Sequence, residues 1–147
     1  MSSNKFFVLL FLVCVSYSQD DRLIRRDTPH ECHDHVHWVL ALDRSGSMKR
    51  GNPNSRWEEL TSLVNGNGTG SGILNDFQGD HISAYMFTDS VIEFPGRIEH
   101  EPVPASLPLE DESPYGGTVF HKAIERAAAI MDDYPDDHTC FYLITDG

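Results

Sequence analysis

The chain has 147 residues and a formal net charge of −12, with 11 Lys and Arg against 23 Asp and Glu. This length allows a single domain with a substantial hydrophobic core. A phosphate backbone is repelled by so acidic a surface, so we predict that nucleic acid is not a partner.

The first 18 residues have the pattern of a secretory signal peptide. Lys5 precedes an apolar run over 6–15, and Ser16 and Ser18 provide small residues at −3 and −1 of a cleavage site after Ser18. The run is too short for an ordinary membrane span, and no other run in the sequence approaches one. We therefore expect a secreted, extracellular protein without a stable membrane span.

Residues 19–35 form a polar and charged lead-in to the domain expected over 36–147. Arg25-Arg26 in this lead-in is a candidate dibasic processing site, although such pairs are common in linkers. Further along, Asn67 in the sequence Asn67-Gly68-Thr69 is an N-glycosylation acceptor that an exported chain can use. The glycines around it lack the Lys-Ser/Thr ending of a phosphate loop, so we interpret this stretch as a flexible loop.

Two cysteines remain after Cys14 leaves with the signal peptide, and export to an oxidising compartment permits a disulfide between Cys32 and Cys140. If strands over 36–43 and 139–146 are parallel neighbours, Cys32 lies roughly 16 Å behind the level of Cys140. A bridge tolerates only about 4.4–6.8 Å between Cα atoms. The pairing therefore requires the lead-in to fold back, and the alternatives are a buried thiol at Cys140 and an unpaired Cys32.

Strand-like and helix-like segments alternate along the expected domain, which is typical of an α/β fold. Residues 36–43 and 139–145 are near-continuous apolar runs, typical of strands buried on both faces of a parallel sheet. Residues 81–88 form a further expected strand, and 91–94 a short one that pairs antiparallel with it at the sheet edge. Scattered prolines predict a loop over 95–115.

Two helices are expected between these strands. Ser55 and Glu58 have the spacing of a capping box, and Asn65-Gly66 ends the first helix. The second follows Gly116-Gly117 and closes at Asp136-Asp137. Its apolar face is expected to comprise Val119, Phe120, Ala123, Ile124, Ala127, Ile130, Met131 and Tyr134.

Oxygen-bearing side chains stand where three of these elements begin or end. Asp43, Ser45 and Ser47 alternate directly after the first strand, Thr118 follows two glycines before a helix, and Asp146 follows the last strand. Ligands of open α/β sheets bind beyond the carboxyl ends of the strands, and Mg²⁺ prefers six oxygen ligands. The alternative is that these residues merely cap turns and helices. We favour a site for Mg²⁺, with Mn²⁺ as a substitute.

The five positions, in this order and context, resemble the metal-ion-dependent adhesion site of von Willebrand factor type A (VWA) domains. That pattern is Asp-x-Ser-x-Ser on one loop, a Thr on a second and an Asp on a third. The likeness covers about residues 36–147 and includes Gly46, Gly116-Gly117 and Ile144-Thr145-Asp146-Gly147. It implies an α/β fold with a doubly wound, mostly parallel sheet.

The resemblance also implies roles for these residues. In the family, the two serines and the threonine contact the metal directly, which implies Ser45, Ser47 and Thr118 as direct ligands. Asp43 and Asp146 would act largely through water. A protein ligand would supply an Asp or Glu carboxylate to the open coordination position, as in cell adhesion, and the chain would not be an enzyme.

The chain departs from the family in length, because VWA domains carry two more strands and helices after the segment that matches Asp146. We therefore expect a fold that is incomplete at its C-terminal side, with 139–145 as an exposed sheet edge that promotes self-association or partial unfolding. The chain would then be a non-functional fragment, a truncated product, or a domain completed by another chain.

A metal-dependent hydrolase or phosphoryl-transfer enzyme is the rival from another class. It requires a general base near the metal, and the ionisable neighbours in the loops are Arg44, Lys49, Arg50 and Glu112, none with an evident placement for that role. A serine nucleophile is not favoured either, because no Gly-x-Ser-x-Gly surrounds the two serines. The binding module is therefore preferred.

Histidines are concentrated before the first strand, in a run of His30, Cys32, His33, His35 and His37. His33, His35 and His37 would share one face of a strand, where Zn²⁺ or Cu²⁺ is a candidate ligand. The i, i+2 spacing matches no usual zinc pattern, so a solvated lead-in is the favoured interpretation. His121, by contrast, is expected on a helix surface.

Overall fold

The computed structural model describes residues 9–16, 36–51, 53–66, 72–110 and 112–146. The strands are β1 (Leu9–Ser16), β2 (His37–Asp43), β3 (His81–Phe87), β4 (Val91–Pro102) and β5 (His138–Thr145). The helices are the 3₁₀ turn η1 (Gly46–Lys49), α1 (Arg56–Asn65), α2 (Ile73–Asp76) and α3 (Phe120–Asp133).

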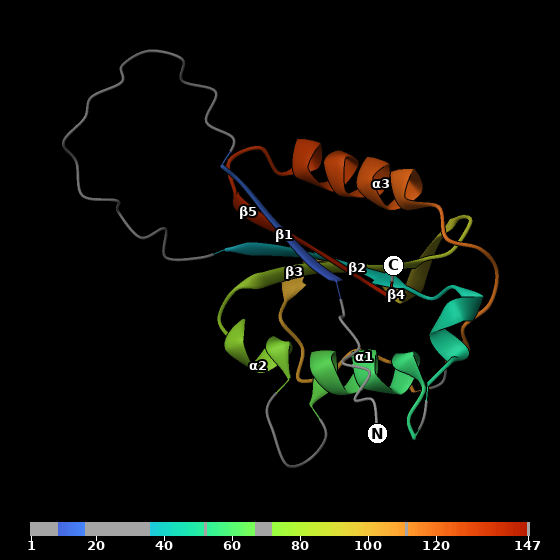
Figure 1. Ribbon diagram of the computed structural model, residues 1–147. Coiled ribbons are helices and arrows are strands. Elements are labelled where there is room, and N and C mark those ends of the chain that lie inside the picture. The colour runs from blue at the N-terminus through green and yellow to red at the C-terminus, as the bar shows by residue number, and fades with distance from the viewer. Residues whose placement is uncertain (1–8, 17–35, 52, 67–71, 111, 147) are drawn as a thin grey trace.

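The strands form one mixed sheet in the order β1-β5-β2-β3-β4. β2 pairs in parallel with both β3 and β5, whereas β3–β4 and β1–β5 are antiparallel pairs. Figure 1 shows α3 on one face of the sheet and α1 and α2 on the other. The α/β class is therefore confirmed, and so is the expected parallel pairing of the strand over 36–43 with the strand over 139–145, which are β2 and β5.

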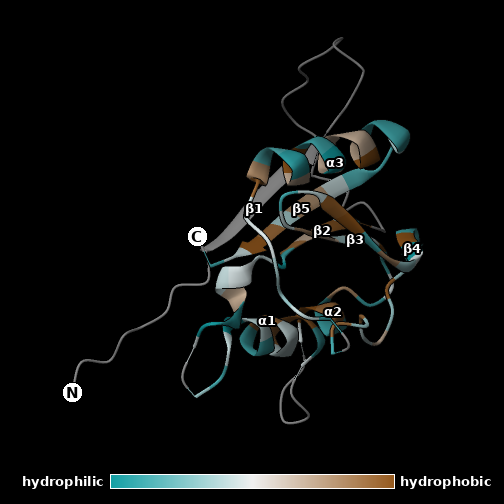
Figure 2. Cartoon of the chain, turned by 90° about the vertical axis from the view of Figure 1, so that its right-hand side faces the viewer, coloured by the Kyte–Doolittle hydropathy of each residue, from teal (hydrophilic) through white to brown (hydrophobic). Residues whose placement is uncertain are grey.

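The apolar run of β2 supplies the core on both faces of the sheet. Leu40 and Leu42 pack in the cluster that includes α1 and α2, and Val39 and Ala41 pack in the cluster under α3. Alternate residues of a strand point to opposite faces, so a strand between two helix layers must be apolar throughout. Figure 2 shows hydrophobic colour on the central strands between the helix layers.

The capping box predicted at the start of α1 is present. The Ser55 side chain accepts a hydrogen bond from the Glu58 backbone N–H at 3.2 Å, and a Glu58 carboxylate oxygen accepts the Ser55 N–H at 2.7 Å. These bonds satisfy two donors that the first turn leaves without helical partners. The helix then buries Trp57, Leu60 and Val64 against the sheet.

The buried face of α3 is narrower than the sequence predicts. Ala123, Ala127 and Ile130 are buried, but Phe120 is 38% exposed and Ile124 is 53% exposed. Two of the three buried positions are small alanines, and the bulkier Phe120 and Ile124 lie outside this contact. The expectation that Phe120 and Ile124 belong to the buried face is therefore wrong.

β4 continues to Pro102, so the loop predicted from Pro95 onward begins later than expected. A proline is tolerated there because β4 is an edge strand with one side free of ladder hydrogen bonds. The pairing with β3 shifts register on both sides of Ala84, and His100 has a positive φ of 53°. The irregular backbone extends the strand while redirecting its side chains.

β5 is not the sheet edge in this structure, contrary to the sequence expectation. β1 pairs with it along its length, from Leu9 opposite Thr145 to Ser16 opposite His138. β1 lies within the stretch predicted as a signal peptide, so cleavage after Ser18 would remove this strand from the sheet. The uncovered strand would then be the edge that the sequence predicts.

Several predicted features fall outside the described residues, namely Cys32, Asn67 and Arg25-Arg26. The proposed Cys32–Cys140 bridge is therefore untested, and Cys140 itself is buried on β5. His121 is exposed on α3, as predicted. Within the described part of the chain, no helix has both the length and the apolar character needed to cross a bilayer.

Candidate functional site

Asp43 ends β2 and is fully buried. Its Oδ1 accepts the backbone N–H of Ser45 at 2.8 Å, and its Oδ2 accepts the Thr145 hydroxyl at 2.6 Å. A buried carboxylate requires such donors, because burial without them is costly. Asp43 therefore fixes the start of the following loop and links it to the end of β5.

The two serines continue this network toward the protein surface. The Ser47 hydroxyl donates to Asp146 Oδ1 at 3.0 Å, and the Ser45 and Ser47 hydroxyl oxygens lie 2.9 Å apart. Because the Ser47 hydrogen is used toward Asp146, the Ser45 hydroxyl is the donor in the second bond. The carboxyl ends of β2 and β5 are thus bridged by a short series of oxygen atoms.

The loop that carries Thr118 is held against this network by backbone hydrogen bonds. Gly46 N–H donates to Gly116 O at 3.0 Å, and Tyr115 N–H donates to Arg44 O at 2.9 Å. A Cβ at Gly46 would lie 3.3 Å from the Gly116 oxygen, so a glycine suits this close approach. Four of the five predicted residues share hydrogen bonds, and Thr118 lies on the adjoining loop, half-buried.

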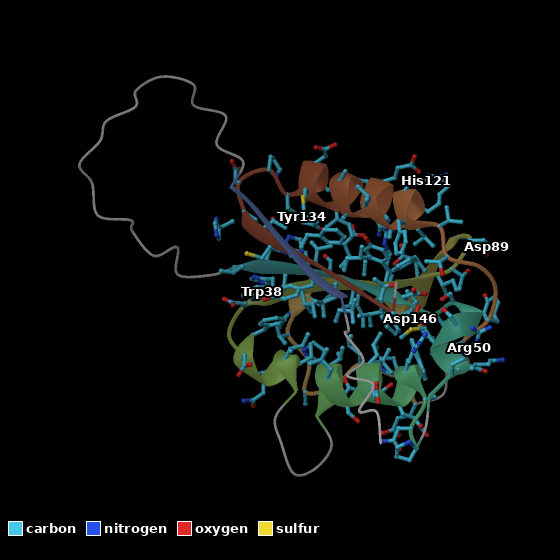
Figure 3. The ribbon with its side chains drawn as sticks, in the orientation of Figure 1. Trp38, Arg50, Asp89, His121, Tyr134 and Asp146 are labelled. Carbon is cyan, nitrogen blue, oxygen red and sulfur yellow. The ribbon has the colours of Figure 1, made fainter. Side chains whose placement is uncertain are left out.

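Arg56 is a member of this site that the sequence reasoning missed. It is the first residue of α1, and its guanidinium forms an ion pair with Asp146 Oδ2. The Asp146 side chain is only 6% exposed, so this positive charge offsets the cost of burying the carboxylate. Figure 3 shows Asp146 between the end of the sheet and α1. No pattern in the sequence distinguishes Arg56 from any other first-turn residue.

A second ion pair flanks the site. Arg44 Nη2 lies 2.6 Å from Glu112 Oε2, and the Arg44 guanidinium carbon lies 4.8 Å from the centre of the Tyr115 ring. Both charged side chains are mostly buried, which favours a fixed geometry over a loose surface contact. These contacts brace the two loops on either side of Gly46.

The side chains at this end of the sheet suit a hard cation. Ser45 and Ser47 offer hydroxyl oxygens, and Asp43 and Asp146 offer carboxylates, which is an all-oxygen set of the kind that Mg²⁺ prefers. Arg56 already engages Asp146 Oδ2, so Oδ1 is the oxygen of that residue turned toward the serines. The donor set therefore fits Mg²⁺.

A histidine-rich cluster lies at the opposite ends of the same strands. His37 Nε2 is 2.7 Å from Ser83 Oγ, and His100 Nε2 is 2.6 Å from Asp137 Oδ2. From the sequence we considered His37 as a metal ligand together with residues 30–35, which lie outside the described structure. A sequence feature that points to a histidine-rich end of the sheet is that β2, β3 and β5 each begin with a histidine.

Burial is the main cause that lowers the pKa of His37 to about 4, with contributions from the neighbouring His100 and His81 and an opposing effect of Asp137. The His37 side chain is only 1% exposed. The imidazole is therefore neutral at physiological pH.

Comparison with family models, with curated proteins and with solved structures gave no significant match to this chain.

The depressed pKa of His37 predicts a loss of stability in acid. Below pH 6.5 the unfolded His37 binds a proton, whereas the folded one stays neutral down to about pH 4. The free energy of unfolding should therefore fall as pH decreases through this window, by up to about 3 kcal/mol. Denaturant melts in chelator, compared with His37→Gln, measure this contribution.

The exposed His121 provides the matched control, since His121→Gln should keep the acid-dependent loss of stability. A wild-type protein with the same pH slope as His37→Gln between pH 4 and 6.5 would contradict the prediction.

Proposed function

We propose that this chain is an exported binding module of the VWA type, with a doubly wound sheet, that engages an acidic group of a protein ligand through Mg²⁺. The observation that supports this most is the hydrogen-bonded oxygen network that joins Asp43, Ser45, Ser47 and Asp146. It lies beyond the carboxyl ends of the parallel strands β2 and β5, where open α/β sheets bind ligands.

In the proposed mechanism, hydroxyl and carboxylate side chains have different roles in binding the metal. Ser45, Ser47 and Thr118 would hold the ion directly, and Asp43 and Asp146 would orient its waters. Neutral hydroxyls offset little of the ion's charge, so bound Mg²⁺ supplies an electrophilic position for an Asp or Glu carboxylate of the protein ligand. Asp43 fixes the position of the loop that carries Ser45 and Ser47, because it accepts hydrogen bonds from the Ser45 backbone N–H and from the Thr145 hydroxyl.

Arg56 provides a resident positive charge at the same place. Its ion pair with Asp146 balances that carboxylate when the metal is absent. A Mg²⁺ ion held beside Asp146 would be repelled by the guanidinium of Arg56, which already pairs with that carboxylate. We infer that Arg56 keeps the affinity for Mg²⁺ moderate, so that metal and acidic ligand bind together more readily than metal alone.

The binding module is preferred over a metal-dependent hydrolase because the nearby charged groups already have partners. Arg44 is paired with Glu112 and Arg56 with Asp146. The side chains of Lys49 and Arg50 are exposed. A general base must reach the proton that it abstracts, and a paired or outward-facing side chain is poorly placed for this.

Mg²⁺ should stabilise the folded protein by mass action. At a free concentration of 100 times Kd, the free energy of unfolding should rise by about 2.7 kcal/mol. Ser47→Ala should remove most of this gain, because it deletes both a hydroxyl ligand and the bond to Asp146. Calorimetric titration and thermal melts with Mg²⁺ and Mn²⁺ measure the effect.

Ser62→Ala on the exposed side of α1 is the matched control, and it should respond to Mg²⁺ like the wild type. Asp43→Asn tests the same site from its buried end. An equal Mg²⁺ response in Ser47→Ala, Asp43→Asn and the wild type would refute the metal assignment.

Arg56→Gln should tighten Mg²⁺ binding, because it removes a positive charge that competes for Asp146. A charge repulsion of about 1–2 kcal/mol corresponds to roughly tenfold in Kd. Titration calorimetry at low and high ionic strength measures the change. Weaker Mg²⁺ binding in Arg56→Gln would show that Arg56 instead positions Asp146 for the metal.

If the chain is exported, the secreted protein should have a defined N-terminus. Expression in a secreting eukaryotic host should yield protein in the medium that begins at Gln19, with a second form at Asp27 if Arg25-Arg26 is cut. N-terminal sequencing identifies the ends, and Asn67→Gln should reduce the mass by one glycan. A cell-bound product that retains Met1 would contradict the export proposal.

A further inference from the structure

We propose that His37, His100 and Asp137 form a binding site for a divalent transition cation of the zinc class, at the opposite end of the sheet from the oxygen network. The three residues come from the start of β2, from β4 and from the turn between α3 and β5. Their candidate ligand atoms all lie within 4.8 Å of one another. The proposal is independent of the Mg²⁺ site.

The strongest support is a buried nitrogen without a hydrogen-bond partner. His37 Nδ1 lacks one among the described residues, although the side chain is only 1% exposed. Its nearest charged neighbour is Asp137 Oδ2 at 3.4 Å. A buried polar atom in this condition is costly and calls for an explanation such as an ion.

The hydrogen bonds around Ser83 show why a cation fits here. Ser83 Oγ accepts the His100 backbone N–H at 2.9 Å and lies 2.7 Å from His37 Nε2. If His37 donates its Nε2–H to this oxygen, its Nδ1 lone pair faces the Asp137 carboxylate, and two acceptors oppose each other. In that tautomer, a cation between the two atoms would replace the repulsion with two attractive contacts. An outer hydrogen bond of this kind is also how ligating histidines are oriented.

Two of the distances between ligand atoms are near those of a zinc site. Zn–N and Zn–O bonds of about 2.0–2.2 Å place neighbouring ligand atoms of a tetrahedral site roughly 3.3–3.5 Å apart. The 3.4 Å between His37 Nδ1 and Asp137 Oδ2 agrees with this spacing. The 2.6 Å between His100 Nε2 and Asp137 Oδ2 must widen by less than about 1 Å.

Asp137 can make that adjustment because its side chain is 33% exposed, and the side chain of His100 is 27% exposed. Their exposure also leaves room for water to complete the coordination. Two nitrogen ligands and one carboxylate favour zinc over Mg²⁺, which prefers oxygen alone.

The surroundings hold the His100 ring in place. It stacks between His81, at a centroid distance of 4.4 Å, and Tyr134, at 4.2 Å. Its backbone has a positive φ of 53°, which non-glycine residues rarely adopt, and it lies in the part of β4 where the pairing with β3 shifts register. Backbone strain of this kind is often found at functional sites. A cation here would join β2, β4 and the α3–β5 turn.

Titration calorimetry with zinc chloride on the chelator-treated full chain tests the proposal. One zinc ion should bind per chain. His100→Gln and Asp137→Asn should each weaken binding by more than the roughly 10–100-fold that loss of an outer-shell partner costs. Both residues are partly exposed, so these variants should fold, which circular dichroism checks. The exposed His121→Gln should bind zinc like the wild type.

Two further variants identify the source of any binding. A chain with His30, His33 and His35 changed to Ala should retain the affinity, and so should Ser47→Ala at the oxygen network. Equal zinc affinity in His100→Gln, Asp137→Asn and the wild type would overturn the proposal. So would normal binding in those two variants together with loss of binding in the His30/His33/His35 variant.

Discussion

The parallel pairing of β2 with both β3 and β5 is the constraint on which the rest of this structure depends. Parallel neighbours align their carboxyl ends on one side of the sheet and their amino ends on the other. This alignment places Thr145 where its hydroxyl reaches Asp43, and it brings Asp146 to the serine loop. At the other end it places the turn before β5 close to His37. The oxygen network and the approach of Asp137 to His37 therefore follow from one register, whereas His100 is brought there by β4.

The carboxyl and amino ends of the parallel strands carry different kinds of side chain. The loop after β2 folds back as η1 and presents small hydroxyls and carboxylates, with a glycine where the neighbouring loop touches it. The amino ends present aromatic nitrogen bases, packed by ring stacking around His100. Oxygen ligands suit hard cations and imidazoles suit borderline ones, so the ends favour different metals.

Patterns that are local in sequence predicted the structure well. The apolar runs gave the parallel strands, and the Ser55–Glu58 spacing gave the start of α1. Features that depend on distant contacts were missed. Whether Ile124 is buried depends on how closely α3 approaches the sheet, and the length of β4 depends on a register shift opposite Ala84. Arg56 and Asp137 have no local motif, because their partners lie far away in sequence.

The separation of the two clusters bears on how bound cations would act on the fold. β2 rises about 3.3 Å per residue, so its ends at His37 and Asp43 are roughly 20 Å apart. Effects at sites more than about 7–10 Å apart without shared partners usually add. Each cation would therefore contribute its own mass-action term to stability. The oxygen end ties β5 to the loop after β2, and the histidine end ties β4 and the α3–β5 turn to β2, so the two terms would stabilise different connections of one sheet.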